Sequence, residues 1–400
     1  MSDAIGKSEC QLQSCIWQAI IAMQQRYELA LWEEFAMNAF FVTALVNVVN
    51  TINFIIQNEY RDNDLYLVPA AAGSPDMAER LKETGLFQSV TLLPDILLTY
   101  PLSMRKVFHI AKRRFAVLKM LKGKKYDAIY LNSDGWYQNS IIYAGLKKVN
   151  RETEIVLMEN ALNTYSFSYF EKPWYLRAFI NMLGMTVLDG RYIKKTYVYQ
   201  PEALCAKQPG EILPLPKLDP GSQRLMDSLN IVFSVQQAAQ DFIGKRFVII
   251  EQKELMVSSD TKLLWQTISQ YLNKEKSIIK AHPRQQNSNL MGMGIDVSKN
   301  HSIPWEVLLL QMNLENMTIL SVLSSSCLLP KLMMGKEPRV ILLYKLLPTN
   351  FVQQGSQLSS FVEKVASLYA ERSRFFVPEN LVELEAYLVA LTEEQEDTKR

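Results

Sequence analysis

The 400-residue sequence is poor in the residues that mark several common kinds of site. It contains 4 cysteines, 15 glycines and 3 histidines. Four scattered cysteines are too few for a disulfide framework, so we expect reduced thiols in a cytoplasmic protein. The glycines form neither a GxGxxG nor a GxxxxGKS/T motif, which argues against a dinucleotide fold and a P-loop enzyme. No cluster of histidine, cysteine and aspartate has metal-ligand spacing, so we predict that the protein needs no metal and no other cofactor.

The sequence also lacks a charge imbalance and a convincing membrane span. Its formal net charge is +2, with 48% hydrophobic and 21% charged residues, which is a globular composition that indicates no nucleic-acid partner. The N-terminal residues do not have the basic-then-apolar pattern of a signal peptide. The most apolar early stretch, residues 29–46, carries Glu33 and Glu34 in its middle and is a poor transmembrane candidate. The length suits two domains.

Apolar runs that alternate with helical patterns are the main structural signal. Runs bounded by turn residues predict two sets of strands. They lie at residues 40–46, 64–70, 89–94, 127–134, 154–160 and 196–202, and then at 246–252, 277–283, 317–326 and 339–344. Strands that alternate with helices pair in parallel as βαβ units. We therefore predict an α/β fold of the GT-B type, in which two Rossmann-like doubly wound domains face a central cleft.

A proline-rich break at residues 213–223 marks the expected domain boundary. The predicted organisation is an N-terminal helical extension (1–38), a first Rossmann-like domain (39–215), a linker (216–245), a second Rossmann-like domain (246–376) and a C-terminal acidic helix or tail (377–400). We expect the tail to pack back across the boundary. In doubly wound sheets, ligands lie at the carboxyl ends of the strands. The residues that follow each strand are therefore the candidates for function.

The predicted strand at 277–283 runs into Lys280, His282, Pro283 and Arg284. Proline suits a first helical position because its missing N–H needs no partner there, and the free N–H groups of a helix start favour an anion. Histidine adds a hydrogen-bond donor that titrates near neutral pH. These residues are candidates for binding a phosphate. The alternative is a histidine that caps a helix and bonds only to the backbone.

Ser324, Ser325 and Ser326 end the predicted strand at 317–326. Three hydroxyls between a strand and a helix can donate to phosphate oxygens, although a serine run alone is usually a helix N-cap. Between His282 and the serines, Glu306 begins a helical pattern, where it can accept hydrogen bonds from ribose hydroxyls. The three groups occur in order in one domain and together predict a nucleotide-phosphate site.

Glu159 ends the predicted strand at 154–160 and faces the predicted cleft. A carboxylate there can act as a general base on an acceptor hydroxyl. The alternatives are an N-cap and a surface loop residue. Asn132, Ser133 and Asp134 follow another strand of the same half and are candidates for contact with the acceptor. An Asp-x-Asp sequence at 62–64 precedes a strand, so we interpret it as a turn and not as a metal–nucleotide motif.

The order of an acidic strand end, a His-Pro pair and a serine run resembles bacterial sialyltransferases of the lipooligosaccharide and capsule type. Those enzymes share an Asp/Glu-Asp/Glu-Gly motif, an HP motif and a serine-rich motif. Here KAHPR matches the second motif, LSSS matches the third and IPWE looks like the intervening element, so the resemblance covers most of residues 40–345. The first motif departs from the pattern. It reads Glu159-Asn160-Ala161, so the first acid is kept and an amide and an alanine follow.

The resemblance implies an inverting, metal-independent transfer of sialic acid from CMP-sialic acid to a capsule or lipooligosaccharide glycan. Glu159 would take the proton of the acceptor hydroxyl, His282 would donate to the departing phosphate, and the serine run would bind its oxygens. Asn160 would lie on the acceptor side. Such a reaction needs the leaving charge stabilised and the acceptor oriented. If the second acid of the first motif matters, the amide at Asn160 lowers activity.

Residues 105–125 form a basic segment with nine lysines and arginines and an interleaved apolar side. Such a helix can lie on anionic lipid or hold an anionic glycan. The alternative is a solvated outer face of an α/β layer. The lipid interpretation predicts a cytoplasmic protein that contacts the inner face of the bacterial membrane peripherally.

Two other functions fit the same residues. A CDP-glycerol-type glycerophosphotransferase would also set His-Pro and serine motifs against a cytidine nucleotide, and its product would be a phosphodiester. A non-catalytic relative would bind a nucleotide or a glycan without turnover. A sialyltransferase differs from both, because it forms a glycosidic bond.

Overall fold

The computed structural model describes residues 37–68, 75–93, 112, 115–132, 152–160, 162–166, 190–252, 259–282, 288–290, 292–299, 303–347 and 356–397. Nearly all of the predicted N-terminal extension falls outside this part of the chain. So do four of the candidate site residues, namely Ser133, Asp134, Pro283 and Arg284.

Seven parallel strands form the first sheet, in the order β3-β2-β1-β4-β5-β6-β7. They are β1 (Asn38–Val42), β2 (Asn63–Leu67), β3 (Ser89–Leu92), β4 (Ala128–Leu131), β5 (Glu154–Met158), β6 (Ile193–Val198) and β7 (Glu211–Pro214). The expectation that this half ends with a strand at 196–202 is wrong, because β7 follows. The four residues of β7 lie at the sheet edge and none is buried, so they carry little apolar signal.

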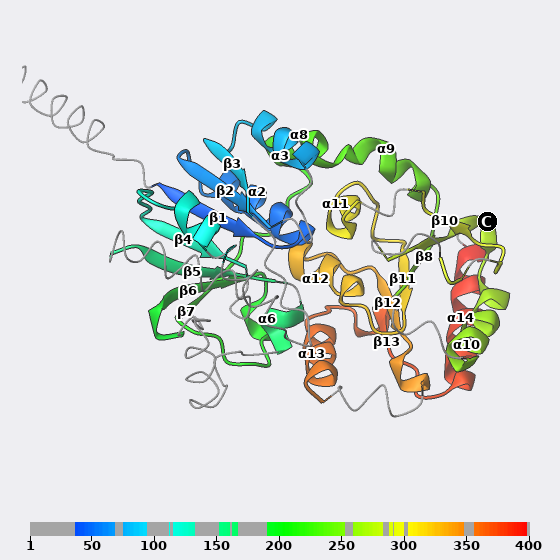
Figure 1. Cartoon of the computed structure of the whole chain (residues 1–400). Coiled ribbons are helices and arrows are strands. Elements are labelled where there is room, and N and C mark those ends of the chain that lie inside the picture. Colours follow the sequence, from blue (N-terminus) through cyan, green and yellow to red (C-terminus); the bar gives the residue numbers. More distant parts are fainter. Residues whose placement is uncertain are drawn as a thin grey trace, which may run out of the picture.

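Six parallel strands form the second sheet, in the order β10-β9-β8-β11-β12-β13. They are β8 (Phe247–Ile250), β9 (Ser277–Lys280), β10 (Asp296–Val297), β11 (Thr318–Ser321), β12 (Arg339–Leu342) and β13 (Phe375–Phe376). In both sheets the first six strands follow the doubly wound order 3-2-1-4-5-6. The two sheets lie side by side with helices between and around them (Figure 1), so the predicted α/β fold of the GT-B type is confirmed.

Strand β1 shows why the apolar runs form buried strands. Every residue of NAFFV is buried. Phe40 belongs to the larger hydrophobic cluster and stacks on Tyr130, with ring centroids 4.4 Å apart. Phe41 belongs to the smaller cluster and stacks on Tyr66 at 4.6 Å. Because both faces of a parallel sheet are covered, its strands are apolar throughout and do not alternate with polar residues. The larger cluster contains residues of both sheets, so the two halves share one core.

The segment between the two sheets is largely helical. Helix α8 (Gln223–Phe233) packs against α2 (Leu45–Gln57) and α3 (Pro75–Glu83) of the first half. It leads into α9 (Val235–Ala239), which packs against α11 (Trp305–Leu309) of the second half (Figure 1). The predicted proline-rich break therefore lies just before a helix that joins the two halves.

The last two helices pack on different halves. Helix α13 (Ser356–Ser367) packs against α6 (Leu162–Ser166) of the first half, and the Lys364 ammonium donates to the carbonyl of Leu204 there. Helix α14 (Leu381–Asp397) packs against α10 (Ser259–Tyr271) of the second half (Figure 1). The expectation that the acidic tail packs back across the boundary is therefore wrong. The crossing element is α13, which precedes it.

The interpretation of residues 62–64 as a turn is wrong only in part, because Asp62 lies in a bend before β2 but Asp64 lies within β2. The buried carboxylate of Asp64 accepts hydrogen bonds from the Ser89 hydroxyl (2.5 Å), the Tyr126 hydroxyl (2.6 Å) and the Lys124 ammonium (2.9 Å). Burial alone would raise the pKa of this carboxyl, but the three hydrogen bonds outweigh it and lower the pKa. Lys124 belongs to the basic segment, so this cluster attaches the end of that segment to the first sheet.

Candidate active site

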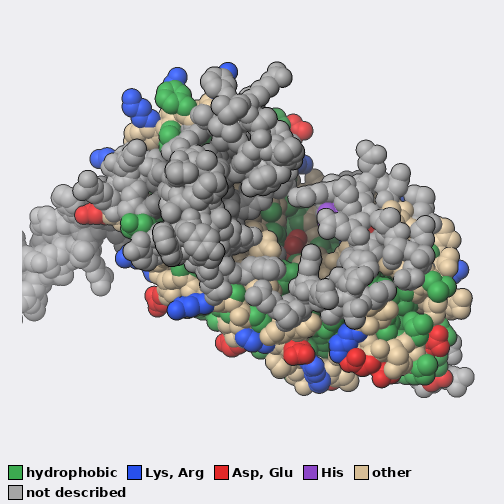
Figure 2. Space-filling view, turned by 60° about the horizontal axis from the view of Figure 1, so that its bottom comes forward, with side chains coloured by type: hydrophobic (Ala, Val, Ile, Leu, Met, Phe, Trp, Pro, Cys, Tyr) green, Lys and Arg blue, Asp and Glu red, His purple; other side chains and the backbone are tan. Residues whose placement is uncertain are grey.

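The strand order of each sheet indicates where a ligand would bind. The order reverses between β1 and β4 in the first sheet and between β8 and β11 in the second. Doubly wound folds bind ligands outside the carboxyl ends of the strands at such a switch point. Figure 2 shows a hollow between the two halves, with acidic and histidine side chains visible in it. The residues that follow these strands are therefore the candidates for chemistry.

Glu159 directly follows β5, and its side chain is only 1% exposed. Its Oε2 atom accepts hydrogen bonds from the Tyr165 hydroxyl (2.6 Å) and the backbone N–H of Tyr199 (2.7 Å). Burial raises the pKa of this carboxyl to about 7, although both hydrogen bonds favour the charged form and lower it. Glu159 is therefore not a surface loop residue. Among the described residues none donates to Oε1, which leaves that oxygen for a substrate.

Three elements hold the Glu159 region in place. From α2, the Asn50 amide donates to the Glu159 carbonyl (3.2 Å) and accepts a hydrogen bond from the Tyr199 hydroxyl (2.8 Å). From α13, Phe361 stacks on the ring of Tyr165, with ring centroids 4.9 Å apart and an interplanar angle of 29°. The Glu159 N–H bonds to the carbonyl of Tyr197 in β6 (2.9 Å). The carboxylate is thus positioned by both halves of the molecule.

Lys280 and Glu306 bring opposite charges from the second half. Lys280 ends β9 and is 3% exposed, and burial lowers its pKa to about 8 while the charge of Glu306 opposes that shift. Glu306 lies in the first turn of α11, and loss of water around its carboxyl raises its pKa. The pKa of Tyr199 is raised by burial and by the charges of Glu159 and Glu306. Glu306 therefore interacts electrostatically with the Glu159 cluster across the two halves.

The serine run begins a short helical turn after β11. The Ser324 hydroxyl accepts a hydrogen bond from the N–H of Ser326 at 3.3 Å. Ser324 is therefore a helix N-cap, as the alternative interpretation of the serine run expects. Within the described part of the chain, no residue bonds to the hydroxyls of Ser325 and Ser326. The Trp305 indole N–H donates to the carbonyl of Ser326 (2.9 Å). This bond joins the IPWE element, which carries Glu306, to the serine run.

His282 lies two residues after β9 and is partly buried. It stands at the same sheet edge as Lys280, beside the switch point. Pro283 and Arg284 lie outside the described residues, so their roles in donor binding stay predictions.

Two predicted acceptor-side residues lie at the carboxyl edge of the first sheet. Asn132 directly follows β4 and is 2% exposed. Asn160 follows Glu159 and is half-buried, and its Oδ1 atom accepts a hydrogen bond from the Asn47 amide (3.2 Å). Ser133 and Asp134 lie outside the described residues.

Several residues that organise the site were not predicted. Tyr165 and Tyr199 contact Glu159 directly. Gln252 follows β8 and exchanges two hydrogen bonds of 2.9 Å with the backbone of Leu323, which joins the ends of β8 and β11 at the second switch point. Nothing local in the sequence marks these three residues, because each bond depends on how separate strands are brought together.

Asparagines on α2 were also missed, although a signal for them exists. Asn47, Asn50 and Asn53 recur every three residues in an otherwise apolar helix, and all three are buried. Buried amides must find hydrogen-bond partners. A row of amides on the buried side of a helix therefore predicts a polar region beneath it, and here that region is the Glu159 cluster.

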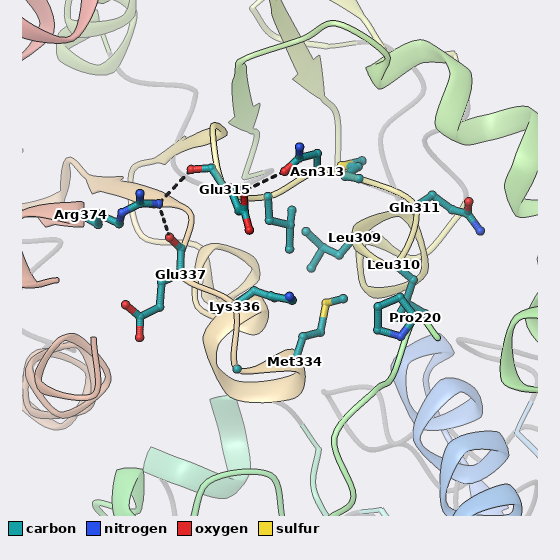
Figure 3. Close-up of a pocket in the computed structure, with 13 residues that line it drawn as sticks. Pro220, Leu309, Leu310, Gln311, Asn313, Glu315, Met334, Lys336, Glu337 and Arg374 are labelled. Atoms are coloured by element: carbon teal, nitrogen blue, oxygen red, sulfur yellow. Dashed lines mark hydrogen bonds between the residues drawn. The ribbon is translucent and has the colours of Figure 1, made fainter. Parts of the chain in front are cut away.

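A partly open pocket of about 560 Å³ is lined by Pro220 and by residues of the second half (Figure 3). Its lining residues are Pro220, Leu309, Leu310, Gln311, Met312, Asn313, Leu314, Glu315, Met334, Gly335, Lys336, Glu337 and Arg374. Glu315, Glu337 and Arg374 lie within three residues before β11, β12 and β13, respectively. The cavity is thus at the amino ends of these strands, away from the edge where doubly wound sheets bind ligands. We therefore do not assign the donor site to it.

Two kinds of feature are absent from the described ranges. Among these residues, no three histidine, cysteine, aspartate or glutamate side chains are grouped so that they could hold a metal ion. No helix in the same part of the chain has both the length and the apolar character needed to cross a bilayer.

One of three comparisons with known proteins identifies a family. The family described as alpha-2,8-polysialyltransferase (POLYST) matches residues 38–344. No protein of curated function matches the chain significantly in sequence. The solved glycotransferase of kitacinnamycin is 10% identical, with a TM-score of 0.46 over 89% of this chain and 90% of that one. An alpha,alpha-trehalose-phosphate synthase (UDP-forming) from Burkholderia vietnamiensis is 6% identical, with a TM-score of 0.37 over 91% and 99%. These two structural similarities are too low to support a conclusion about function.

Proposed function

Because the chain belongs to the alpha-2,8-polysialyltransferase family, we propose that it transfers sialic acid from CMP-sialic acid to a glycan acceptor with inversion. The acceptor that the family description suggests is a glycan that already ends in sialic acid, such as a capsule or lipooligosaccharide chain. One observation carries this proposal. Burial raises the pKa of the Glu159 carboxyl to about 7, and the charges of Glu159 and of Glu306 in the second half both act on Tyr199.

Glu159 has the properties of the general base in this reaction. A base works best when its pKa lies near the operating pH, and this one is about 7. The Oε1 atom would take the proton from the acceptor hydroxyl as the oxygen forms its bond to the anomeric carbon. The bond between that carbon and the phosphate oxygen breaks in the same step, and its electron pair leaves with CMP. Attack from the side opposite the leaving group gives inversion.

The second half would stabilise the leaving CMP. His282 would donate a hydrogen bond or a proton to the phosphate, and the hydroxyls of Ser325 and Ser326 would bind its oxygens, while Ser324 holds the turn. Lys280 would add positive charge close to the phosphate, where a buried donor is strong. Glu306 would accept hydrogen bonds from the ribose. These side chains can offset the charge of a phosphate, so the proposed reaction needs no metal ion and no cofactor beyond the donor itself.

The basic segment suggests a peripheral position on the inner face of a membrane. Phe115 is 72% exposed and lies between the exposed Lys112 and Lys119, at helical spacings of three and four residues. Val117 and Leu121 on the other side are buried in the smaller hydrophobic cluster. An aromatic ring held between lysines on the outer face of a helix suits a surface of anionic lipid. The alternative, in which this helix is only a solvated outer face of the α/β layer, explains the exposed lysines but not the exposed phenylalanine.

Release of CMP from CMP-sialic acid tests the proposed function. The protein should release CMP, and Glu159→Gln and His282→Ala should each reduce the rate by at least about 100-fold. Glu154→Gln is a matched control, because Glu154 begins the same strand and is partly exposed. Binding of CMP without release would favour a non-catalytic relative. Transfer from CDP-glycerol with a phosphodiester product would favour the glycerophosphotransferase.

A further inference from the structure

Buried amides gather at the switch point of the first sheet, beside the proposed base. Strands β1 and β4 are parallel neighbours there, with Phe41 paired to Leu131. The next residues are Thr43, one position beyond β1, and Asn132, directly after β4. Helix α2 starts from the same edge and contributes Asn47. This edge is the place where a doubly wound sheet binds a ligand.

Asn132 has a hydrogen-bond donor without a partner. The residue is 2% exposed, and its Nδ2 atom is fully buried with no acceptor among the described residues. Leaving a buried donor unpaired costs folding free energy, and native proteins keep few such groups. An unpaired amide at a ligand-binding edge therefore indicates that its acceptor comes from a bound molecule.

Asn160 supplies a second donor through a directed chain of hydrogen bonds. The Thr43 hydroxyl donates to Oδ1 of Asn47 (3.2 Å), and Nδ2 of Asn47 donates to Oδ1 of Asn160 (3.2 Å). The chain orients the Asn160 amide so that its Nδ2 atom points away from Asn47. No residue in the described ranges accepts from that Nδ2 atom, and Asn160 is only half-buried. A ligand can therefore reach it.

We propose that Asn132 and Asn160 form an amide-lined subsite that holds the terminal sugar of the acceptor through its oxygen atoms. This inference rests on the proposed function and identifies the part of the site that selects the acceptor. Both amides offer N–H groups, so they recognise hydroxyl, N-acyl carbonyl and carboxylate oxygens, all of which a sialic acid carries. Amides also provide donors without a positive charge, so they do not form an ion pair with Glu159. Thr43 and Asn47 are positioning residues, because they orient Asn160 without touching the sugar.

Replacing each amide by the isosteric acid tests the subsite. Asn132→Asp and Asn160→Asp remove the donor and keep the shape. The probe is a short α-2,8-linked oligosialic acid, and its binding to the full chain is measured by saturation-transfer NMR or calorimetry, without turnover. Each variant should bind it at least about tenfold more weakly, while the affinity for CMP stays unchanged. Asn58→Asp is the matched control, since Asn58 is exposed at the far end of α2.

The outcomes separate this inference from the proposed function. Unchanged binding of the probe in both variants would overturn the subsite, and so would a wild-type protein that does not bind the probe. An equal loss of CMP affinity would overturn it as well, because that would show general disruption. If the wild type binds the probe but never releases CMP from CMP-sialic acid, the proposed function fails and the subsite stands. If Asn132→Asp does not fold, Asn160→Asp decides alone, because its side chain is only half-buried.

Discussion

Removing the Tyr165 hydroxyl should shift the pH dependence of turnover to higher pH. This hydroxyl donates to Glu159 Oε2 at 2.6 Å, and both residues are buried. The bond favours the charged carboxylate and holds the pKa of Glu159 lower than burial alone would set it. In Tyr165→Phe the ring keeps its place against Phe361, and the hydrogen bond from the Tyr199 N–H remains. The variant therefore changes one contact of the base.

The size of the shift follows from the strength of that contact. A hydrogen bond to a charged group contributes about 1.5–3 kcal/mol, and one pKa unit corresponds to about 1.4 kcal/mol. The pKa of Glu159 should therefore rise by about one to two units from its value of about 7. Near neutral pH the charged fraction would fall about 5- to 50-fold, and the rate would fall with it. At high pH the variant should approach the plateau of the wild type.

The assay is release of CMP as a function of pH, analysed as kcat/KM, which reports ionisations of the free enzyme. Tyr130→Phe is the control, because it also removes a buried hydroxyl, one that bonds to Tyr60 at 3.1 Å and not to Glu159. Its pH profile should match that of the wild type. A uniform loss of activity in Tyr165→Phe at every pH, without a shift of the profile, would refute the assignment of Glu159 as the base.

Three further predictions concern stability and location. Glu159→Gln should stabilise the folded protein above neutral pH. Folding raises the pKa of the Glu159 carboxyl from 4.5 to about 7. Its contribution to stability is therefore complete below pH 4.5 and is lost as the pH rises through 7. In urea, the free energy of unfolding of the variant should exceed that of the wild type by up to about 3 kcal/mol near pH 8 and should differ little near pH 4. An equal difference at the two pH values would contradict this. Phe361→Ala should lower the free energy of unfolding by about 3–5 kcal/mol and reduce turnover, because it leaves a cavity beside Tyr165; an unchanged denaturation midpoint would show that α13 does not hold the site. Phe115→Ser combined with Lys119→Gln should weaken binding to vesicles with anionic lipid by about tenfold or more and leave neutral vesicles unaffected, whereas equal binding to anionic vesicles would exclude this surface.

Much of the fold could be predicted because both faces of each sheet are covered. FVII of β8 and AFFV of β1 are apolar and buried at every position, so they stand out from their surroundings. Their alternation with helical patterns then implies parallel pairing. The position of the site followed from the same rule, because the carboxyl ends of parallel strands share one edge. Glu159, Lys280 and Asn132 all lie at such ends.

Other features could not be predicted because their signals are weak or distant. Strand β13 has two residues and β7 lies half-exposed at an edge, so neither has a periodic pattern. The partners of Glu159 come from α6, from the end of β6 and, through Phe361, from α13 near the other end of the chain. No sequence pattern within one segment indicates a contact between residues of such distant segments. Burial raises the pKa of Glu159 and the bonds from Tyr165 and Tyr199 oppose that rise, so the net shift could only be obtained from the structure.

The amide at position 160 is consistent with a base that titrates near neutral pH. The resembling enzymes carry a second acid there, whereas this chain has Asn160 in a hydrogen bond from Asn47. A carboxylate in its place would add a negative charge next to Glu159 in the sequence, and like charges near each other in a partly buried site repel. That repulsion would raise the pKa of Glu159 and keep more of the proposed base protonated at pH 7. Asn160→Asp should therefore shift the pH profile of turnover upward in addition to weakening acceptor binding. A profile that moves downward, or a rate that rises at pH 7, would show that the second acid assists the reaction and that the amide is a loss.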